Sequence, residues 1–248
     1  MDSVAFDGVA GRDLARQLGV PQVNLFGVVP TTMDLAHAAA EAGAPAGTLI
    51  IAEEQAAGRG RGGKRWQSPP RRGLWMTLIE RPRSGRGLDV LSLRLGLCAA
   101  EVLDPFAAGA VRLKWPNDLQ VAGRKLAGIL VEARWRDQHV EWVAIGFGLN
   151  VAAPDDLELA TGLVEGTRRI DVLSALVPAL RQAAAAEGTF TDQELARYAA
   201  RDVGAGRRIR QPAQGVVVGV SASGELLVDT VAGRVACHGG SLVFAEEG

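Results

Sequence analysis

One short stretch of the chain concentrates glycine and positive charge. It reads GRGRGGKR over residues 58–65. The whole sequence is nearly balanced, with 27 basic and 28 acidic residues, yet residues 58–72 contain no acidic residue and six cations: Arg59, Arg61, Lys64, Arg65, Arg71 and Arg72. Alternating glycines let backbone amides approach a ligand, and arginines bind carboxylate and phosphate oxygens. The stretch therefore predicts a local anion-binding loop.

Similar glycine-rich, basic stretches also occur in phosphate loops and in RNA-binding arginine–glycine boxes. A phosphate loop would need Ser or Thr after Lys64 and a helix starting there. Arg65 follows instead, and two prolines then precede a strand. An RNA-binding arginine–glycine box would need a repeated, disordered segment, but this one occurs once, between apolar strands. A charged, solvent-exposed loop without a ligand remains the alternative.

Two further stretches carry polar groups next to predicted strands. RLKWPNDLQVAGRKLAGILVE (residues 112–132) surrounds a proline turn and a β-turn with Lys114, Asn117, Asp118 and Lys125. GFGLNV (residues 146–151) ends a strand with two glycines and Asn150. Pro, Asn and Asp are all turn formers, so WPND alone predicts no more than a turn. The combination of the three stretches is more informative than any one of them.

Together these stretches resemble the motifs of the biotin–protein ligases. That family carries G-R-G-R-x-G-R-x-W-x-S-P, K-W-P-N-D, K-L-A-G-I-L and G-x-G-x-N in this order. The chain has GRGRGGKRWQSP, KWPNDL, KLAGIL and GFGLN in the same order, and the resemblance extends from about Val28 to the C-terminus. It implies an ATP-dependent ligase that converts biotin and ATP to biotinyl-5′-AMP and pyrophosphate. The biotin would then pass to a lysine of a biotin carboxyl carrier domain.

The resemblance also assigns roles to individual residues. Thr31 stands where the family has Ser, and Lys64 stands where it usually has Arg. The catalytic residues it implies are Arg59, Arg61, Asp118 and Lys125. The implied biotin-binding residues are Thr31, Thr32, Met33, Gln55, Arg59, Gly60, Arg61, Lys125 and Gly128. The implied ATP- and adenylate-binding residues are Arg61, Trp66, Lys114, Asn117, Asp118, Lys125 and Asn150.

The implied chemistry needs positive charge rather than an enzyme nucleophile. In the first step the biotin carboxylate attacks the α-phosphorus of ATP, so one anion attacks another. Arg59, Arg61 and Lys125, together with Mg²⁺ as the partner of ATP, would neutralise the developing charge. In the second step the carrier lysine must lose a proton, since the pKa of a free lysine is about 10.4. Asp118 is a candidate base or metal-side ligand, and no resident metal site is expected.

Helical periodicity, caps and apolar runs predict an α+β order of elements. Thr31 lies three residues before Asp34, the spacing of a capping box. Predicted helices cover residues 12–19, 31–43, 88–103, 169–188 and 192–203. Predicted strands cover residues 23–29, 47–55, 73–80, 111–115, 124–135 and 139–151, and short strands with tight turns follow Gly204.

This order predicts a mixed β-sheet with helices packed on it, followed by a small β unit. By resemblance, the first would be a catalytic domain like that of class II aminoacyl-tRNA synthetases, at residues 1–203. The second would be an SH3-like β-barrel at residues 204–248. Too few residues precede Thr31 for the winged helix-turn-helix of some family members, so we expect a monofunctional enzyme without operator binding.

The remaining composition constrains location and partners. Cys98 and Cys237 are isolated, so they give no basis for a disulfide framework or zinc cluster. No apolar run approaches the ~18 residues of a membrane span. The N-terminal residues lack the pattern of a secretory signal. We therefore expect a cytoplasmic protein without a membrane partner. None of His37, His139 and His238 lies near a motif in sequence, so we expect solvated or structural histidines.

A net charge of −1 predicts no nucleic-acid partner. The expected partner is the biotin carboxyl carrier domain of an acyl-CoA or pyruvate carboxylase, and the chain would be a monomer or a homodimer. Two alternatives stay open: a lipoyl or octanoyl ligase of the same superfamily, and a non-catalytic biotin or nucleotide sensor.

Overall fold

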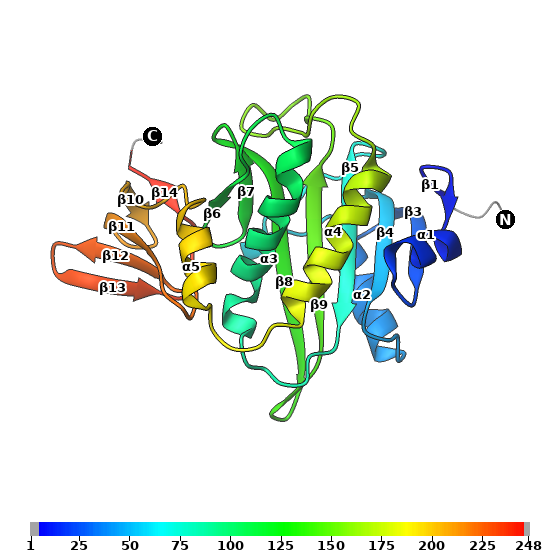
Figure 1. Cartoon of the computed structure of the whole chain (residues 1–248), viewed down its shortest axis with the longest axis horizontal. Helices are drawn as coiled ribbons and strands as arrows, with labels where there is room; N and C mark the ends of the chain where they lie inside the picture. Colours follow the sequence, from blue (N-terminus) through cyan, green and yellow to red (C-terminus); the bar gives the residue numbers. More distant parts are fainter. Residues whose placement is uncertain (1–4, 246–248) are drawn as a thin grey trace.

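A seven-stranded mixed sheet forms the centre of the molecule (Figure 1). The computed structural model describes residues 5–245. The outer strands β3 and β4 are parallel, and every other neighbouring pair in this sheet is antiparallel. In spatial order the strands are β3 (Val23–Val29), β4 (Thr48–Gln55), β5 (Gly73–Glu80), β9 (His139–Asn150), β8 (Arg124–Arg136), β7 (Asp118–Val121) and β6 (Arg112–Lys114).

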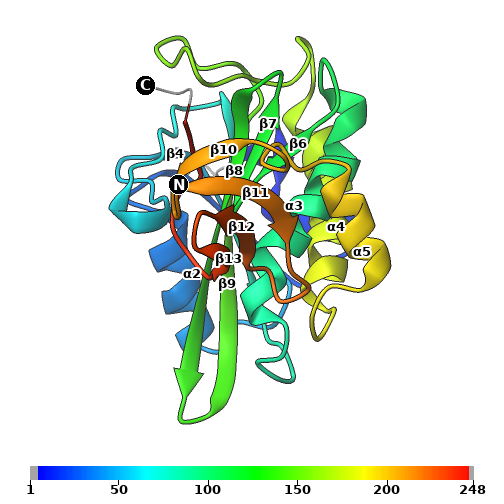
Figure 2. The same ribbon diagram turned by 90° about the vertical axis from the view of Figure 1, so that its left-hand side faces the viewer.

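Helices cover both faces of the sheet unequally. Figure 2 shows α2 (Thr32–Glu41) on one side of the strands and α3 (Leu88–Leu103) with α4 (Arg169–Ala184) on the other. The helix α1 (Gly11–Leu18) packs against β3 and α4, and α5 (Asp192–Ala199) packs against α3. The two-helix face is therefore a closed layer, whereas α2 leaves part of the opposite face uncovered by helix.

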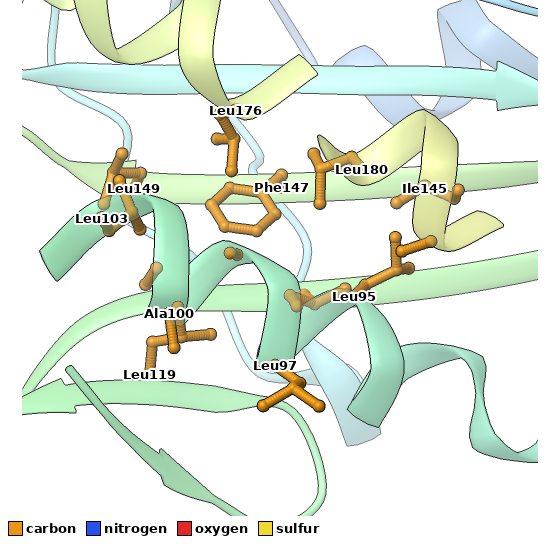
Figure 3. Close-up of a cluster of buried hydrophobic side chains, with 14 of the residues drawn as sticks. Leu95, Leu97, Ala100, Leu103, Leu119, Ile145, Phe147, Leu149, Leu176 and Leu180 are labelled. Atoms are coloured by element: carbon orange, nitrogen blue, oxygen red, sulfur yellow. The ribbon is translucent and has the colours of Figure 1, made fainter. Parts of the chain in front are cut away.

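Strand alternation explains why the faces differ. Successive side chains of a strand point to opposite sides. In β9, Ile145, Phe147 and Leu149 point into the α3–α4 layer, where Leu176 and Leu180 of α4 meet them (Figure 3). On the other face of the same strand, Ala144 joins a smaller core with α2, and two glycines follow.

The C-terminal residues form a second, antiparallel sheet beside β6 and β7 (Figure 1). Its core is continuous with the main one, because Ile209, Val217 and Phe244 belong to the same buried cluster as α3. The indole of Trp115 donates a hydrogen bond across the junction to the carbonyl oxygen of Gly224, at 3.0 Å. The strand order is β13 (Gly233–Cys237), β12 (Leu226–Thr230), β11 (Gly215–Val220), β10 (Arg208–Gln211) and β14 (Val243–Phe244).

The predicted fold class, a mixed sheet with packed helices and a small C-terminal β unit, is confirmed. The division into two domains after residue 203 stays a prediction. Sequence reasoning missed strand β7, which it treated as part of a turn, and the short hairpin of β1 (Ala5–Phe6) and β2 (Val9–Ala10). Both are too short to show an alternating pattern. No helix within residues 5–245 is long and apolar enough to cross a membrane.

The predicted start of α2 is confirmed, but its capping box is not. Thr31 is the N-cap residue, and its hydroxyl accepts a hydrogen bond from the backbone N–H of Met33 at 3.3 Å. The Asp34 carboxylate forms an ion pair with Arg59 instead, at 2.9 Å. The expected capping box is wrong because Arg59, a cation of the glycine-rich loop (residues 58–65), lies within reach of the Asp34 carboxylate.

We expect Leu176→Ala to lower the free energy of unfolding by about 2–5 kcal/mol, because the side chain is fully buried between α4 and the sheet and leaves a cavity. Leu159→Ala is the matched control, since this leucine is 81% exposed, and it should change the free energy by less than about 0.5 kcal/mol. Urea unfolding followed by circular dichroism measures both. Equal effects would contradict the assigned core.

Candidate active site

A cleft of about 520 Å³ lies on the α2 side of the sheet, beyond the N-terminus of that helix. Four segments enclose it: the start of α2, the glycine-rich loop, the turn before β7, and residues 240–243 of the C-terminal sheet region. Strands β5, β8 and β9 form the floor. All the predicted site residues except Asn150 line this cleft: Thr31, Thr32, Met33, Gln55, Arg59, Gly60, Arg61, Trp66, Lys114, Asn117, Asp118, Lys125 and Gly128.

The floor of the cleft lacks side chains at three neighbouring positions. Gly128 of β8 pairs with Gly148 of β9. Two residues further along the ladder, on the same face, Gly146 pairs with Leu130. A Cβ atom on Gly148 would lie 2.5 Å from Cε2 of Trp66, and one on Gly146 would lie 2.7 Å from the Met33 methyl. The glycines thus let the indole lie directly on the sheet and keep the slot beside it open.

A chain of hydrogen bonds crosses the deep end of the cleft. The Gln55 amide oxygen accepts from the backbone N–H and the hydroxyl of Thr32, at 2.9 and 3.1 Å. Because a hydroxyl has one proton, the Thr32 oxygen must then accept from the Thr77 hydroxyl, 2.8 Å away. The Gln55 amide nitrogen donates to the Ser68 hydroxyl at 2.8 Å. The end of the slot is therefore neutral, polar and ordered.

Sequence reasoning missed Thr77 and Ser68. Thr77 is fully buried in β5 and pairs with Gly146 of the floor. A signal for it existed, because it is the one polar residue inside the apolar run LWMTLI. Ser68 had a signal too, because it is the fixed serine of the W-x-S-P end of the motif, here WQSP.

The other end of the cleft is cationic. The Lys125 ammonium forms a 2.7 Å ion pair with Asp118 and lies 5.1 Å from the centre of the Trp66 ring. Arg61 reaches the carbonyl oxygen of Gly240 at 3.4 Å. Burial lowers the pKa of Arg61 from its ordinary value, and Asp118 partly offsets this. A guanidinium is not deprotonated in proteins, so Arg61 is charged. Of the residues lining this cleft in the described chain, Asp118 is the one carboxylate.

Asn117 and Asn150 make hydrogen bonds that hold backbone in place. The Asn117 amide nitrogen donates to the Ile129 carbonyl at 2.7 Å, which ties the WPND turn to β8. Asn150 is 5% exposed and donates to the Thr161 carbonyl at 3.2 Å. It lies outside the main cleft, against an adjoining cavity of about 210 Å³. Arg65, Trp66 and Lys125 line both cavities, so these three residues lie between Asn150 and the other predicted site residues.

The buried indole nitrogen of Trp66 has no hydrogen-bond partner within the described part of the chain. An indole N–H is a donor only, and a buried donor without an acceptor is costly. A ligand that supplies an acceptor beside Trp66 would remove this cost. The residue is thus suited to contact a polar ligand as well as to separate the two cavities.

The structure links one histidine to a predicted site residue through a third side chain, a link that the sequence did not show. His37 bonds to Glu132 at 2.9 Å, and Glu132 in turn lies 3.3 Å from the Arg59 guanidinium. The residues come from α2, β8 and the glycine-rich loop, so no local sequence pattern relates them.

Comparison with known proteins places this fold and cleft in a family. The model of the biotin/lipoate A/B protein ligase family matches residues 25–150. A biotin–[acetyl-CoA-carboxylase] ligase of Mycobacterium tuberculosis is 31% identical over 232 residues, 86% of this chain and 85% of that protein. The chain therefore belongs to the biotin/lipoate A/B protein ligase family.

Two further similarities refine the comparison. The bifunctional ligase/repressor BirA of Bacillus spizizenii is 36% identical over 147 residues, which are 56% of this chain but 45% of that protein. The chain thus spans about half the length of this relative. The biotin protein ligase of Aquifex aeolicus, solved with biotin and ATP, has a TM-score of 0.74 at 23% identity, covering 89% of this chain and 97% of that one. This likeness shows a shared fold.

We expect Gly148→Ala to displace Trp66, because the added Cβ would lie 2.5 Å from the indole, and to cost about 1–3 kcal/mol of stability. Acrylamide should quench the tryptophan fluorescence more strongly, and this increase should vanish in a Trp66→Phe background. Gly27→Ala is the control, since its Cβ would meet nothing within 4 Å. Unchanged quenching in Gly148→Ala would contradict the described floor.

Proposed function

We propose that the protein is a biotin–protein ligase. It activates biotin with ATP to biotinyl-5′-AMP, with release of pyrophosphate, and transfers the biotinyl group to a lysine of a biotin carboxyl carrier domain. One observation carries the proposal: a single cleft runs from a neutral polar end to a cationic end over a glycine floor. Biotin itself has a neutral bicycle at one end and a carboxylate at the other.

The neutral end suits the biotin bicycle. An apolar slot with a few fixed polar groups is the usual form of a small-molecule site. The hydroxyls of Thr31 and Thr32 and the amide of Gln55 offer donors and acceptors for a ureido group, while Met33 and the floor at Gly128 offer the slot. Thr31 also caps α2, so its hydroxyl is oriented by the start of the helix.

The cationic end suits the reacting groups. An oxygen of the biotin carboxylate would attack the α-phosphorus of ATP, and the bond to the β-phosphate oxygen would break as pyrophosphate leaves. Arg59, Arg61 and Lys125 would hold the carboxylate and phosphate oxygens while negative charge develops. Gly60 lets the backbone between the two arginines lie close to these oxygens.

The adenosine would extend past Trp66 towards Asn150. Support comes from the adjoining cavity, which shares Trp66 and Lys125 with the main cleft and is lined by Asn150. The unpartnered indole nitrogen of Trp66 would gain an acceptor there. Lys114 and Asn117, on the turn beside the cleft, would contact the nucleotide from the other side.

Magnesium would enter as part of the substrate Mg·ATP rather than as a resident ion. Within residues 5–245 no group of three His, Cys, Asp or Glu side chains is arranged to hold a metal. The ion supplies positive charge to the triphosphate. Asp118, the carboxylate of the cleft, would then be either a ligand on the metal side or the base that takes a proton from the carrier lysine.

Release of Asp118 from Lys125 would precede either role. The two side chains form an ion pair at 2.7 Å. A phosphate that attracts the Lys125 ammonium would compete with the carboxylate for it. In the second step the deprotonated carrier amine would attack the acyl carbon of the mixed anhydride, and AMP would leave.

The polar end of the slot favours biotin over lipoate or octanoate. An octanoyl chain or a dithiolane ring offers no counterpart to the ureido donors and acceptors of biotin. It would displace water from the Thr32–Gln55 end without forming the hydrogen bonds that a ureido group offers, and the loss of hydrogen bonds on burial is costly. The acceptor is a carrier domain of an acyl-CoA or pyruvate carboxylase, and the chain acts as a monomer or homodimer in the cytoplasm.

We expect the protein, biotin, Mg·ATP and a biotin carboxyl carrier domain to yield a carrier whose mass has risen by one biotinyl group. Intact-mass spectrometry measures this. Lipoate or octanoate in place of biotin should give no modification. A carrier that takes up lipoate and not biotin, or neither, would contradict the proposal.

Variants in the same assay test the role of the cations. Arg61→Ala and Lys125→Ala should each lower the rate by about 10²–10³-fold, because preorganised charges at the reacting atoms are lost. Lys64→Ala is the matched control, since Lys64 belongs to the same loop but is exposed, and it should have a smaller effect. The opposite ranking would support a phosphate loop centred on Lys64.

A further inference from the structure

A line of four side chains runs from the core under α2 to the mouth of the cleft. The Trp142 indole nitrogen lies 2.9 Å from Nδ1 of His37, and His37 Nε2 lies 2.9 Å from Oε2 of Glu132. The same Glu132 oxygen lies 3.3 Å from Nη2 of Arg59. The line connects β9, α2, β8 and the glycine-rich loop. None of its members except Arg59 was singled out by the sequence motifs.

The positions of the protons along this line follow from the donor types. The Trp142 indole N–H can only donate, so Nδ1 of His37 must accept and carries no proton. The proton of the neutral imidazole is then on Nε2, which donates to Glu132. Trp142 thus selects the one tautomer of His37 that can bond to the carboxylate.

The inner end of the line is fixed. Trp142 is 6% exposed and pairs with Arg134 in the β8–β9 ladder. The Arg81 guanidinium lies 5.7 Å from the centre of the Trp142 ring and donates to the carbonyls of Ala40, Ala44 and Glu141. Side-chain exposure then increases outward, from 27% at His37 to 35% at Glu132 and 40% at Arg59. Glu132 is therefore a carboxylate held from behind by a packed layer.

The two carboxylates that contact Arg59 differ in this respect. Asp34 is 63% exposed, and within residues 5–245 its recorded side-chain contact is with Arg59. An exposed ion pair of this kind contributes little, because water competes for both charges. Glu132 is oriented by His37, so it restricts where the guanidinium can lie. Of the two, Glu132 is the anchor.

The Arg59 guanidinium contacts its two carboxylate partners through one of its three nitrogens. Both carboxylates contact the same nitrogen, Nη2: Glu132 accepts a hydrogen bond from it, and Asp34 forms an ion pair with it. Within the described chain, Nε and Nη1 have no recorded partner. A guanidinium presents its donors as a rigid fork, so holding one nitrogen while the side chain is attached at Cα restricts the directions in which the others can point. The free edge remains available for the carboxylate or phosphate oxygens of a ligand.

We infer that Glu132 is a positioning residue for Arg59, and that His37, in the tautomer set by Trp142, positions Glu132. The inference rests on the proposed function, in which Arg59 binds the carboxylate of biotin and its adenylate. Glu132 does not touch the substrate and acts through the orientation of Arg59. Loss of its charge should weaken biotin binding without unfolding the protein.

The test uses the full chain, biotin and Mg·ATP, with biotin-dependent ATP–pyrophosphate exchange as the readout and no carrier. Glu132→Gln keeps the size of the side chain and removes its charge. We expect the KM for biotin to rise about tenfold, with kcat within about twofold and Tm unchanged. Glu41→Gln is the matched control, because Glu41 lines the same hollow beside His37 and Trp142 and makes no recorded contact with Arg59. It should behave as wild type.

A double-mutant cycle shows whether Glu132 acts through Arg59. In an Arg59→Ala background, Glu132→Gln should add less than about a twofold change, since the residue that it positions is gone. Fully additive effects would overturn the inference. An unchanged or lowered KM for biotin in Glu132→Gln would also overturn it, the latter because Glu132 would then withhold Arg59 from the ligand.

Two substitutions of His37 separate orientation from packing. A glutamine amide nitrogen can replace Nε2 as a donor to Glu132, whereas alanine cannot. We expect His37→Ala to raise the KM for biotin about threefold and His37→Gln to stay within about twofold of wild type. Equal effects of the two would overturn the role of His37. A wild-type protein without biotin-dependent exchange would overturn the proposed function itself, and this inference with it.

Discussion

The strict alternation of side chains in β9 and β8 is the constraint on which the rest of the molecule depends. One face of β9 buries Phe147 and its neighbours against α3 and α4, and so supplies the main core. The other face carries Gly146 and Gly148, and Gly128 of β8 extends it. The same strands are thus densely packed on one side and bare on the other. The sheet therefore has a flat slot on one face, while the hydrophobic core on its other face stays fully packed.

The walls of the slot are formed by segments that pack over the glycine positions of this face. The Trp66 indole lies on the glycines, and the start of α2 brings Thr32 to the polar end. The glycine-rich loop brings Arg61 to the other end, and the start of β8 brings Lys125 there. Charge is therefore segregated along the slot: hydrogen-bonding groups without charge lie at one end, and cations with one carboxylate lie at the other. Such segregation suits a ligand that is neutral at one end and anionic at the other.

The sequence predicted the fold class and the family correctly because the signals were local. Apolar runs set the long strands, and the spacing inside each motif identified the loop, the turn and the glycine pair. What it did not predict depends on contacts between distant segments. Asn150 continues the glycine pattern of β9, but Trp66 lies between it and the main cleft. His37 meets Glu132 because α2 packs on β4, β5 and β9, from where its side chain reaches the neighbouring strand β8. Asp34 forms an ion pair with an arginine of the glycine-rich loop and takes no part in a capping box.

A crystal structure of the protein with biotin and an unreactive ATP analogue tests the central claim most directly. The account predicts that the bicycle of biotin lies on the glycine floor, with its ureido group at Thr32 and Gln55 and its carboxylate facing Arg61 and Lys125. Biotin bound away from the floor, or with its carboxylate at the Thr32–Gln55 end, would contradict it.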